Sequence, residues 1–476
     1  MEPSTLIITY TFIILTTLTL IIIKLSGKPR RKLNLPPGPK PWPIIGNLNL
    51  IGALPHRSIH QLSQTYGPIM QLKLGSFPVV VVSSVEMAKA VLNTQDVTFA
   101  SRPKTAAGKH ITYNYSGILW SPYGPYWRQA HKMCIMELFT PKRLESYEYI
   151  RNQELKYLIH DLYEMKPTTV ITLKDYLSIM NVNIISRMVL GRKFTDEGSE
   201  NSIVSPEEFK KMLDELFLLS GVLNIGDSIP WLDFLDLQGY IKRMKKLRKK
   251  FDWFLEHVLD EHNERMTSEG ESFVAKDMVD VLLQLAADPN LEIKLGRDSV
   301  KAFTLDFFVG GIDSSTLTLE WAMSELLKQP QILAKAIEEL DRVTGKNQWV
   351  YEKDIPNLPY IEAIVKETMR MHPVAPTFVP RFRPERFIGK AIDVISNHFE
   401  LLPFGAGRRM CPGYSIGLKV VQVSLANLLH GFKWMLPHGM KAENLNMDEI
   451  FRLSTPRKVP LEVVLEPRLP SHIYFL

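Results

Sequence analysis

Three glycines and one cysteine fall within the ten residues from Phe404 to Gly413. Glycines at this density let the backbone bend closely around Cys411. Pro412 then begins a helical pattern of apolar residues that continues to Leu425. A sulfur at a helix N-terminus beside two arginines should have a lowered pKa, so this loop predicts an anionic thiolate at neutral pH.

The number of cysteines limits what such a thiolate can bind. The chain has 476 residues and only two cysteines, Cys134 and Cys411. This excludes a disulfide framework and any zinc site that needs three or four thiolates. One thiolate without clustered histidines favours a single axial bond to a haem iron, with Arg409 as a partner for a haem propionate. The alternative, an ordinary buried cysteine, is the interpretation we give to Cys134.

The N-terminal segment has the features of a membrane anchor. Leu6–Ile23 is an uncharged run of 18 residues, about 27 Å long as a helix, which is close to the thickness of a hydrocarbon core. Basic residues follow it between 24 and 32, so we expect the remainder of the chain in the cytosol. A cleaved signal peptide is the alternative, but the start lacks a basic region and the large aliphatic residues continue to Ile23.

The rest of the chain predicts a mostly α protein with a small β subdomain. Five prolines in residues 36–43 indicate a stiff hinge. We therefore expect an anchor with a basic stop-transfer segment at 1–33, a hinge at 34–46 and a catalytic domain at 47–476. Helical periodicity covers residues 84–93, 125–138, 143–165, 205–220, 240–265, 296–327, 331–344, 357–371 and 413–430, and strand-like runs cover 70–74, 79–83 and 459–465.

The cysteine loop resembles the haem-binding signature of the cytochrome P450 family, F-x-x-G-x-R-x-C-x-G. Its fixed positions are occupied by Phe404, Gly407, Arg409, Cys411 and Gly413. The anchor and the hinge resemble the endoplasmic-reticulum members, and Leu237-Gln238-Gly239 is similar to the large plant group of secondary metabolism. The resemblance implies the cytochrome P450 fold after a single transmembrane helix, with haem b as the cofactor and Cys411 as the axial ligand of its iron.

The same resemblance assigns further residues. It implies that the cofactor-binding residues are Cys411, Arg409, Trp127, Arg128, Arg381, Phe404 and Gly405. It implies that substrate is faced by residues 103–120, by Phe303, Phe307 and Val309, by residues 374–378 and by Ser454-Thr455. It also implies that Glu367, Arg370 and Arg386 form a structural salt-bridge triad behind the haem.

Residues 310–315 interrupt a long helical pattern with two adjacent glycines, which cost roughly 1 kcal/mol each relative to alanine. They indicate either close helix packing or a local opening of the helix at a ligand. The segment resembles the family's G-G-x-[DE]-T-[TS], with Ser314 in place of threonine. The resemblance implies that Asp313 and Ser314 are catalytic and deliver protons at the haem.

One part of the family pattern is missing. Arg370 and Cys411 are only 41 positions apart, and Arg381 runs directly into Phe382 where relatives have several short strands. We interpret this as an internal deletion between Arg381 and Phe382, from splicing or a faulty gene model. The sheet portion after residue 381 should then be shortened, with edges and apolar surface exposed.

The function implied is that of a haem-dependent monooxygenase in the endoplasmic reticulum membrane. It would insert one oxygen atom of O2 into a small lipophilic metabolite (a terpenoid, a flavonoid or phenylpropanoid, or a steroid). The chain has no dinucleotide fingerprint, so electrons would come from NADPH through a cytochrome P450 reductase. A net charge of +6 is too small to argue for nucleic acid. The alternatives are a non-functional truncated variant that binds haem poorly, and a peroxide-using isomerase or dehydratase.

Overall fold

The structure is a computed structural model. It describes residues 3–25, 34–193, 204–374, 384–389, 392–394 and 398–475, with side chains except at 3–7, 21–25, 386 and 438. Arg381, Phe382 and most of the segment 374–378 therefore lie outside the described residues.

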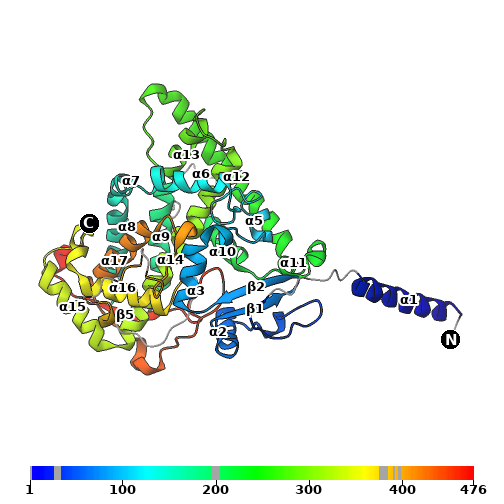
Figure 1. The fold of residues 1–476 in the computed structure, drawn as a ribbon. Coiled ribbons are helices and arrows are strands. Elements are labelled where there is room, and N and C mark those ends of the chain that lie inside the picture. Colours follow the sequence, from blue (N-terminus) through cyan, green and yellow to red (C-terminus); the bar gives the residue numbers. More distant parts are fainter. Residues whose placement is uncertain are drawn as a thin grey trace.

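Helices dominate the body, as the periodicity predicts (Figure 1). They are α2 (Pro55–Tyr66), α3 (Val85–Lys89), α4 (Asp96–Phe99), α5 (Ala106–His110), α6 (Pro125–Met133), α7 (Pro141–Ser146), α8 (Glu148–Tyr163), α9 (Leu173–Leu190), α10 (Pro206–Gly221), α11 (Ile225–Ser228), α12 (Tyr240–Glu269), α13 (Met278–Ala287), α14 (Arg297–Lys328), α15 (Pro330–Thr344), α16 (Pro359–Met371) and α17 (Tyr414–Gly431). Side-chain caps begin several of them: Ser84, Thr105, Thr140, Ser205 and Asp277 accept backbone N–H groups of the first turn.

The helix α14 forms the centre of the body. Nearly all of its residues from 299 to 308 and from 315 to 327 are buried. A helix that is buried on every side must be surrounded by other elements, and α9, α16 and α17 all pack against it. Residues 310–315 belong to α14 itself, and α17, which follows the cysteine loop, packs against it. One central helix therefore positions both regions.

Two small antiparallel sheets complete the fold. In the first, β1 (Ile69–Leu74) pairs with β2 (Phe77–Val82) around a turn at Gly75. The second has the order β3 (Ile171–Thr172), β5 (Glu462–Pro467), β4 (Phe432–Met435). This confirms the mostly α fold with a small β part. Within the described residues, no strand lies between α16 and α17.

The N-terminal run forms the helix α1 (Pro3–Leu25), which lies apart from the body in Figure 1. As expected for threonines in an apolar helix, Thr16 and Thr19 donate back to the Phe12 and Leu15 carbonyls at 2.8 and 2.6 Å. Among the residues searched, which are those described, no helix is both long and apolar enough to cross a membrane. The basic segment at 26–33 lies outside the described residues.

The chain beyond the proposed deletion packs back onto the body. Phe387, Val394 and Leu401 form a small apolar core with Ala363 of α16, and Phe404 of the cysteine loop packs against that core. The Lys366 ammonium donates to the Ile392 carbonyl at 2.9 Å. The segment between α16 and the cysteine loop is short, but it is packed against α16.

Candidate functional site

The loop before α17 is bent as its glycines predict. Gly405 and Gly407 have φ of +70° and +65°, values that only glycine adopts readily. Gly407 also lies against the Leu92 carbonyl, where a side chain would collide. The Cys411 N–H donates to the Phe404 carbonyl at 2.9 Å and closes the loop. The backbone thereby fixes the direction of one thiol.

The expectation of a lowered thiol pKa is wrong. Burial raises the pKa of Cys411, and a hydrogen bond from the Gly413 backbone opposes this only in part. The two neighbouring arginines do not offset the burial because both are directed elsewhere. Arg408 pairs with Asp96 at 3.0 Å, and Arg409 is bound to backbone carbonyls. The thiol becomes a thiolate when a metal takes the place of its proton.

Arg409 holds the cysteine loop against the segment that precedes α6. Its guanidinium donates to the Ala100 carbonyl at 2.7 Å and to the Ser121 carbonyl at 2.6 Å, and it lies 4.2 Å from the centroid of the Trp127 ring. Burial, together with the positive charge of Arg102, lowers the pKa of Arg409 to about 10. Two cations whose charges act on each other favour a nearby anion. Arg102, which the sequence analysis did not name, is the residue that contributes this second positive charge.

Trp127 and Arg128, which were expected to act together, lie in different environments. Trp127 is 4% exposed and donates from its indole to the Ile118 carbonyl at 3.1 Å. Its ring stacks on His131 at 4.7 Å, and His131 in turn hydrogen-bonds the Met410 backbone. The Arg128 guanidinium is exposed and lies 5.8 Å from the Tyr123 ring. Trp127 and Arg409 thus share one cluster, whereas Arg128 lies outside it.

The helix α14 passes through residues 310–315 without interruption, so the expected local opening of its backbone is not found. The two glycines have different roles. A Cβ on Gly311 would lie 2.5 Å from the Ile185 Cδ1 of α9. Gly311 therefore allows close packing of the two helices. Gly310 is exposed and a Cβ there would meet no atom within 4 Å. The buried helix therefore has an uncovered stretch at Gly310.

The acid and the alcohol follow that uncovered stretch. The Ser314 hydroxyl donates to the Gly310 carbonyl at 2.7 Å. The Asp313 carboxylate accepts a hydrogen bond from the Ser454 hydroxyl, and burial raises the pKa of Asp313. A buried carboxyl with a raised pKa beside a hydroxyl is suited to storing and passing a proton.

The salt bridge expected on α16 is present. Arg370 contacts Glu367 through two hydrogen bonds of 2.6 and 2.8 Å, and the two residues are 8% and 0% exposed. Arg386 ends a 3-10 turn that begins at Pro384, but its side chain is outside the described part, as is all of Arg381. The third member of the triad stays a prediction.

Asp306 is a buried acid that the sequence analysis did not identify. It lies on α14 and is 7% exposed. The Leu119 N–H donates to its Oδ2 at 3.0 Å, which fastens the segment before α6 to the central helix. Burial raises the pKa of Asp306 to about 7.

We expect Asp306→Asn to flatten the pH dependence of stability. Because the folded pKa is raised from 3.8 to about 7, the folded state holds more protons than the unfolded state between these values. The free energy of unfolding therefore falls as pH rises through this window, with a limiting slope of about 1.4 kcal/mol per pH unit. Melting temperatures between pH 4.5 and 8.5 should show a smaller decline in the variant. Asp298→Asn, at an exposed acid of the same helix, should keep the wild-type slope, and equal slopes in all three proteins would contradict the assignment.

The residues of the cysteine loop, the Arg102–Arg409 pair and α14 together fit a haem. A free thiol is directed by a glycine loop, and α17, which follows it, packs against α14. A Cβ on Gly310 would meet no atom within 4 Å, so α14 has open space beside this residue. The positive charges of Arg102 and Arg409 would favour the carboxylates of a haem.

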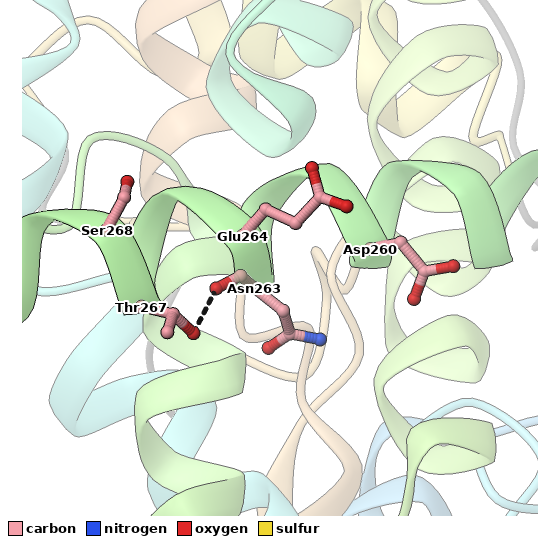
Figure 2. Close-up of a pocket in the computed structure, with 5 residues that line it drawn as sticks. All are labelled: Asp260, Asn263, Glu264, Thr267 and Ser268. Carbon is pink, nitrogen blue, oxygen red and sulfur yellow. Dashed lines mark hydrogen bonds between the residues drawn. The ribbon is translucent and has the colours of Figure 1, made fainter.

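A hollow on α12 is unrelated to this arrangement. Figure 2 shows its lining, and all five residues belong to that one helix: Asp260, Asn263, Glu264, Thr267 and Ser268. The dashed bond in the figure is internal to the helix, from the Thr267 hydroxyl to the Asn263 carbonyl at 2.8 Å. No part of the cysteine loop or of α14 lines it.

Comparison with known proteins agrees with the site. The cytochrome P450 family model matches residues 36–382 and 380–461. The chain is 44% identical to trimethyltridecatetraene synthase of Zea mays, over 95% of this chain and 93% of the relative. It is 42% identical to dimethylnonatriene synthase of Zea mays, over 97% and 96%. It is 39% identical to flavonoid 3'-monooxygenase of Petunia hybrida, over 100% of both chains.

The same comparisons locate the missing residues. The two parts of the family match meet at 380–382, where the sequence analysis put the deletion. The alignment with the petunia relative has 520 positions, whereas this chain has 476 residues, which is 44 fewer. Positions of this relative therefore have no counterpart in this chain, and the family match continues on both sides of residues 380–382. The chain belongs to the cytochrome P450 family of monooxygenases.

Proposed function

We propose that the chain is a haem-thiolate monooxygenase that inserts one oxygen atom of O2 into a small lipophilic plant metabolite. Residues 1–33 would anchor it in the endoplasmic reticulum membrane, residues 34–46 would act as a hinge, and the catalytic domain from residue 47 would face the cytosol. Electrons would come from NADPH through a cytochrome P450 reductase. The observation that carries the proposal is that the cysteine loop and the uncovered stretch of α14 are both formed in this shortened chain.

Each group of site residues would have a separate task. Haem, when bound, would supply the oxygen activation, and the Cys411 sulfur would hold it as a thiolate. Arg409 and Trp127, joined by Arg102, would hold the propionate side. Asp313 and Ser314 would supply protons from the α14 side, since they follow Gly310 and form hydrogen bonds with defined partners.

The substrate class is inferred from the relatives and from the surface of α14. The two maize relatives, at 44% and 42% identity, are named for acyclic polyenes, and the petunia relative, at 39%, is named for flavonoids. Val309 is partly exposed and Gly310 is exposed, and both offer only apolar surface there. Phe303, in contrast, is fully buried and Phe307 nearly so. An apolar surface of this kind suits a terpenoid, which we propose as the first substrate class to test, ahead of flavonoids, other phenylpropanoids and steroids.

Two other functions compete with this proposal. The deletion where the two parts of the family match meet favours a variant that binds haem poorly. That variant is opposed by the core that Phe387, Val394 and Leu401 form on α16, because this core supports Phe404 in the cysteine loop. An isomerase or dehydratase that uses a peroxide would not need a proton supply, and the Asp313–Ser314 pair argues against it.

Isotope labelling distinguishes the three functions. The full chain would be incubated in microsomes with reductase, NADPH, ¹⁸O2 and either acyclic terpenoids or flavonoids. Our proposal predicts products that contain one ¹⁸O atom and that require both NADPH and reductase. Products formed from a lipid hydroperoxide without reductase would support the isomerase or dehydratase instead. A chain without bound haem would support the inactive variant.

A further inference from the structure

The turn that contains Ser454 contacts the central acid of α14. Ser454 is 6% exposed, and its hydroxyl donates a hydrogen bond to Oδ2 of Asp313. The resemblance put Ser454 among residues that face substrate, but its hydroxyl is already bound to this carboxylate. The contact joins residues that are 141 positions apart in the chain.

Several elements fix this turn in place. The indole of Trp321, on α14, donates to the Thr455 carbonyl at 3.0 Å. The Thr455 hydroxyl donates to the Val374 carbonyl at 3.0 Å, which ties the turn to the chain after α16. Gly221, at the end of α10, lies against the backbone of Leu453, where a side chain would collide. Because the turn is held from three sides, Ser454 has little freedom to leave Asp313.

Charged groups from several elements surround the Asp313 carboxyl. Burial raises its pKa, whereas the Ser454 hydroxyl, Lys174 of α9 and Arg452 of the turn lower it. Asp214 of α10 raises the pKa of Asp313, as burial does. Asp313 in turn raises the pKa of Glu320, two turns further along α14. Ser454 is the one group among these that bonds directly to Asp313.

We infer that Ser454 is a positioning residue for Asp313, holding its Oδ2 so that protons are exchanged at Oδ1. This inference rests on the proposed role of Asp313 in proton supply. In each cycle a proton would leave the Oδ1 of the protonated carboxyl and would be replaced from solvent. The Ser454 O–H bond stays intact, and its hydrogen bond stabilises the carboxylate that remains.

The test compares Ser454→Ala, Ser454→Thr and Asp313→Asn in the haem-loaded full chain with reductase. Loss of a hydrogen bond to a charged group should increase the proton affinity of Asp313 about tenfold. We therefore expect Ser454→Ala to raise, by about one unit, the pH midpoint of peroxide release per NADPH oxidised, and Ser454→Thr to restore the wild-type midpoint. Ser324→Ala is a matched control, because this buried serine of α14 donates to the Glu320 carbonyl instead.

A second measurement does not depend on turnover. Melting temperatures of the two single variants and of Ser454→Ala/Asp313→Asn, taken across pH, form a double-mutant cycle. We expect Ser454→Ala to alter the pH dependence in the wild-type background and to leave it unchanged in the Asp313→Asn background.

The outcomes separate the inference from the proposed function. If Asp313→Asn increases peroxide release while Ser454→Ala matches the wild type in both measurements, the positioning role is overturned and the proposed function stands. If neither variant changes peroxide release, the role of Asp313 in proton supply fails, and the inference fails with it.

Discussion

Cys411→Ala is expected to abolish the strongly red-shifted Soret band that the reduced, CO-bound wild-type protein should show in microsomes. The shift reports a thiolate on the iron, and alanine offers no atom that could replace it. Only the unshifted band of a thiolate-free haem, or no haem band at all, should remain. This is the largest spectroscopic effect that a single substitution in the chain should produce.

Cys134→Ala is the matched control for this experiment. Cys134 is the other cysteine of the chain, is 1% exposed and has no place in the cysteine loop. Its variant should keep the shifted band. A shifted band of wild-type strength in Cys411→Ala would refute Cys411 as the ligand. If the wild-type chain lacked the band, the deletion next to Arg381 would be shown to prevent the site from forming.

The local features of the site could be predicted from the sequence. The bend around Cys411 depends on Gly405 and Gly407, whose conformations follow from their residue type. The Glu367–Arg370 pair follows from a spacing of three on one helix. Such features need no knowledge of distant contacts, and the structure contains them.

The features that depend on distant contacts could not be predicted. The pKa of Cys411 differs from the expectation because the sequence does not show that Arg408 turns to Asp96 and Arg409 to backbone carbonyls. Arg102 and Asp306 belong to no motif, and their importance comes from neighbours far along the chain. The helix α9 is absent from the predicted helices because it is buried on almost every side and so lacks the periodicity of a surface helix.

Arg370→Ala should cause a larger loss of stability than any of the other substitutions proposed above. It removes two hydrogen bonds from the Glu367 carboxylate, which is 0% exposed. Removing one member of a buried ion pair costs about 3–5 kcal/mol. For a domain of this size that corresponds to a melting temperature lowered by roughly 3–6 °C. Because α16 also supports the core beneath Phe404, the shifted CO band should weaken in parallel.

The chain contains a matched control with almost the same bond geometry. Arg243 contacts Glu215 through two hydrogen bonds of 2.8 and 2.7 Å, but its side chain is 43% exposed. An exposed pair contributes about 0.2–1 kcal/mol, so Arg243→Ala should lower the melting temperature by about 1 °C or less. If both alanine variants lost the same stability, burial would not be the reason that the α16 pair matters. If Arg370→Ala fails to fold, Arg370→Lys can be measured instead, because lysine keeps the charge without the planar fork. Its melting temperature should be lower than that of the wild type, but the protein should still fold.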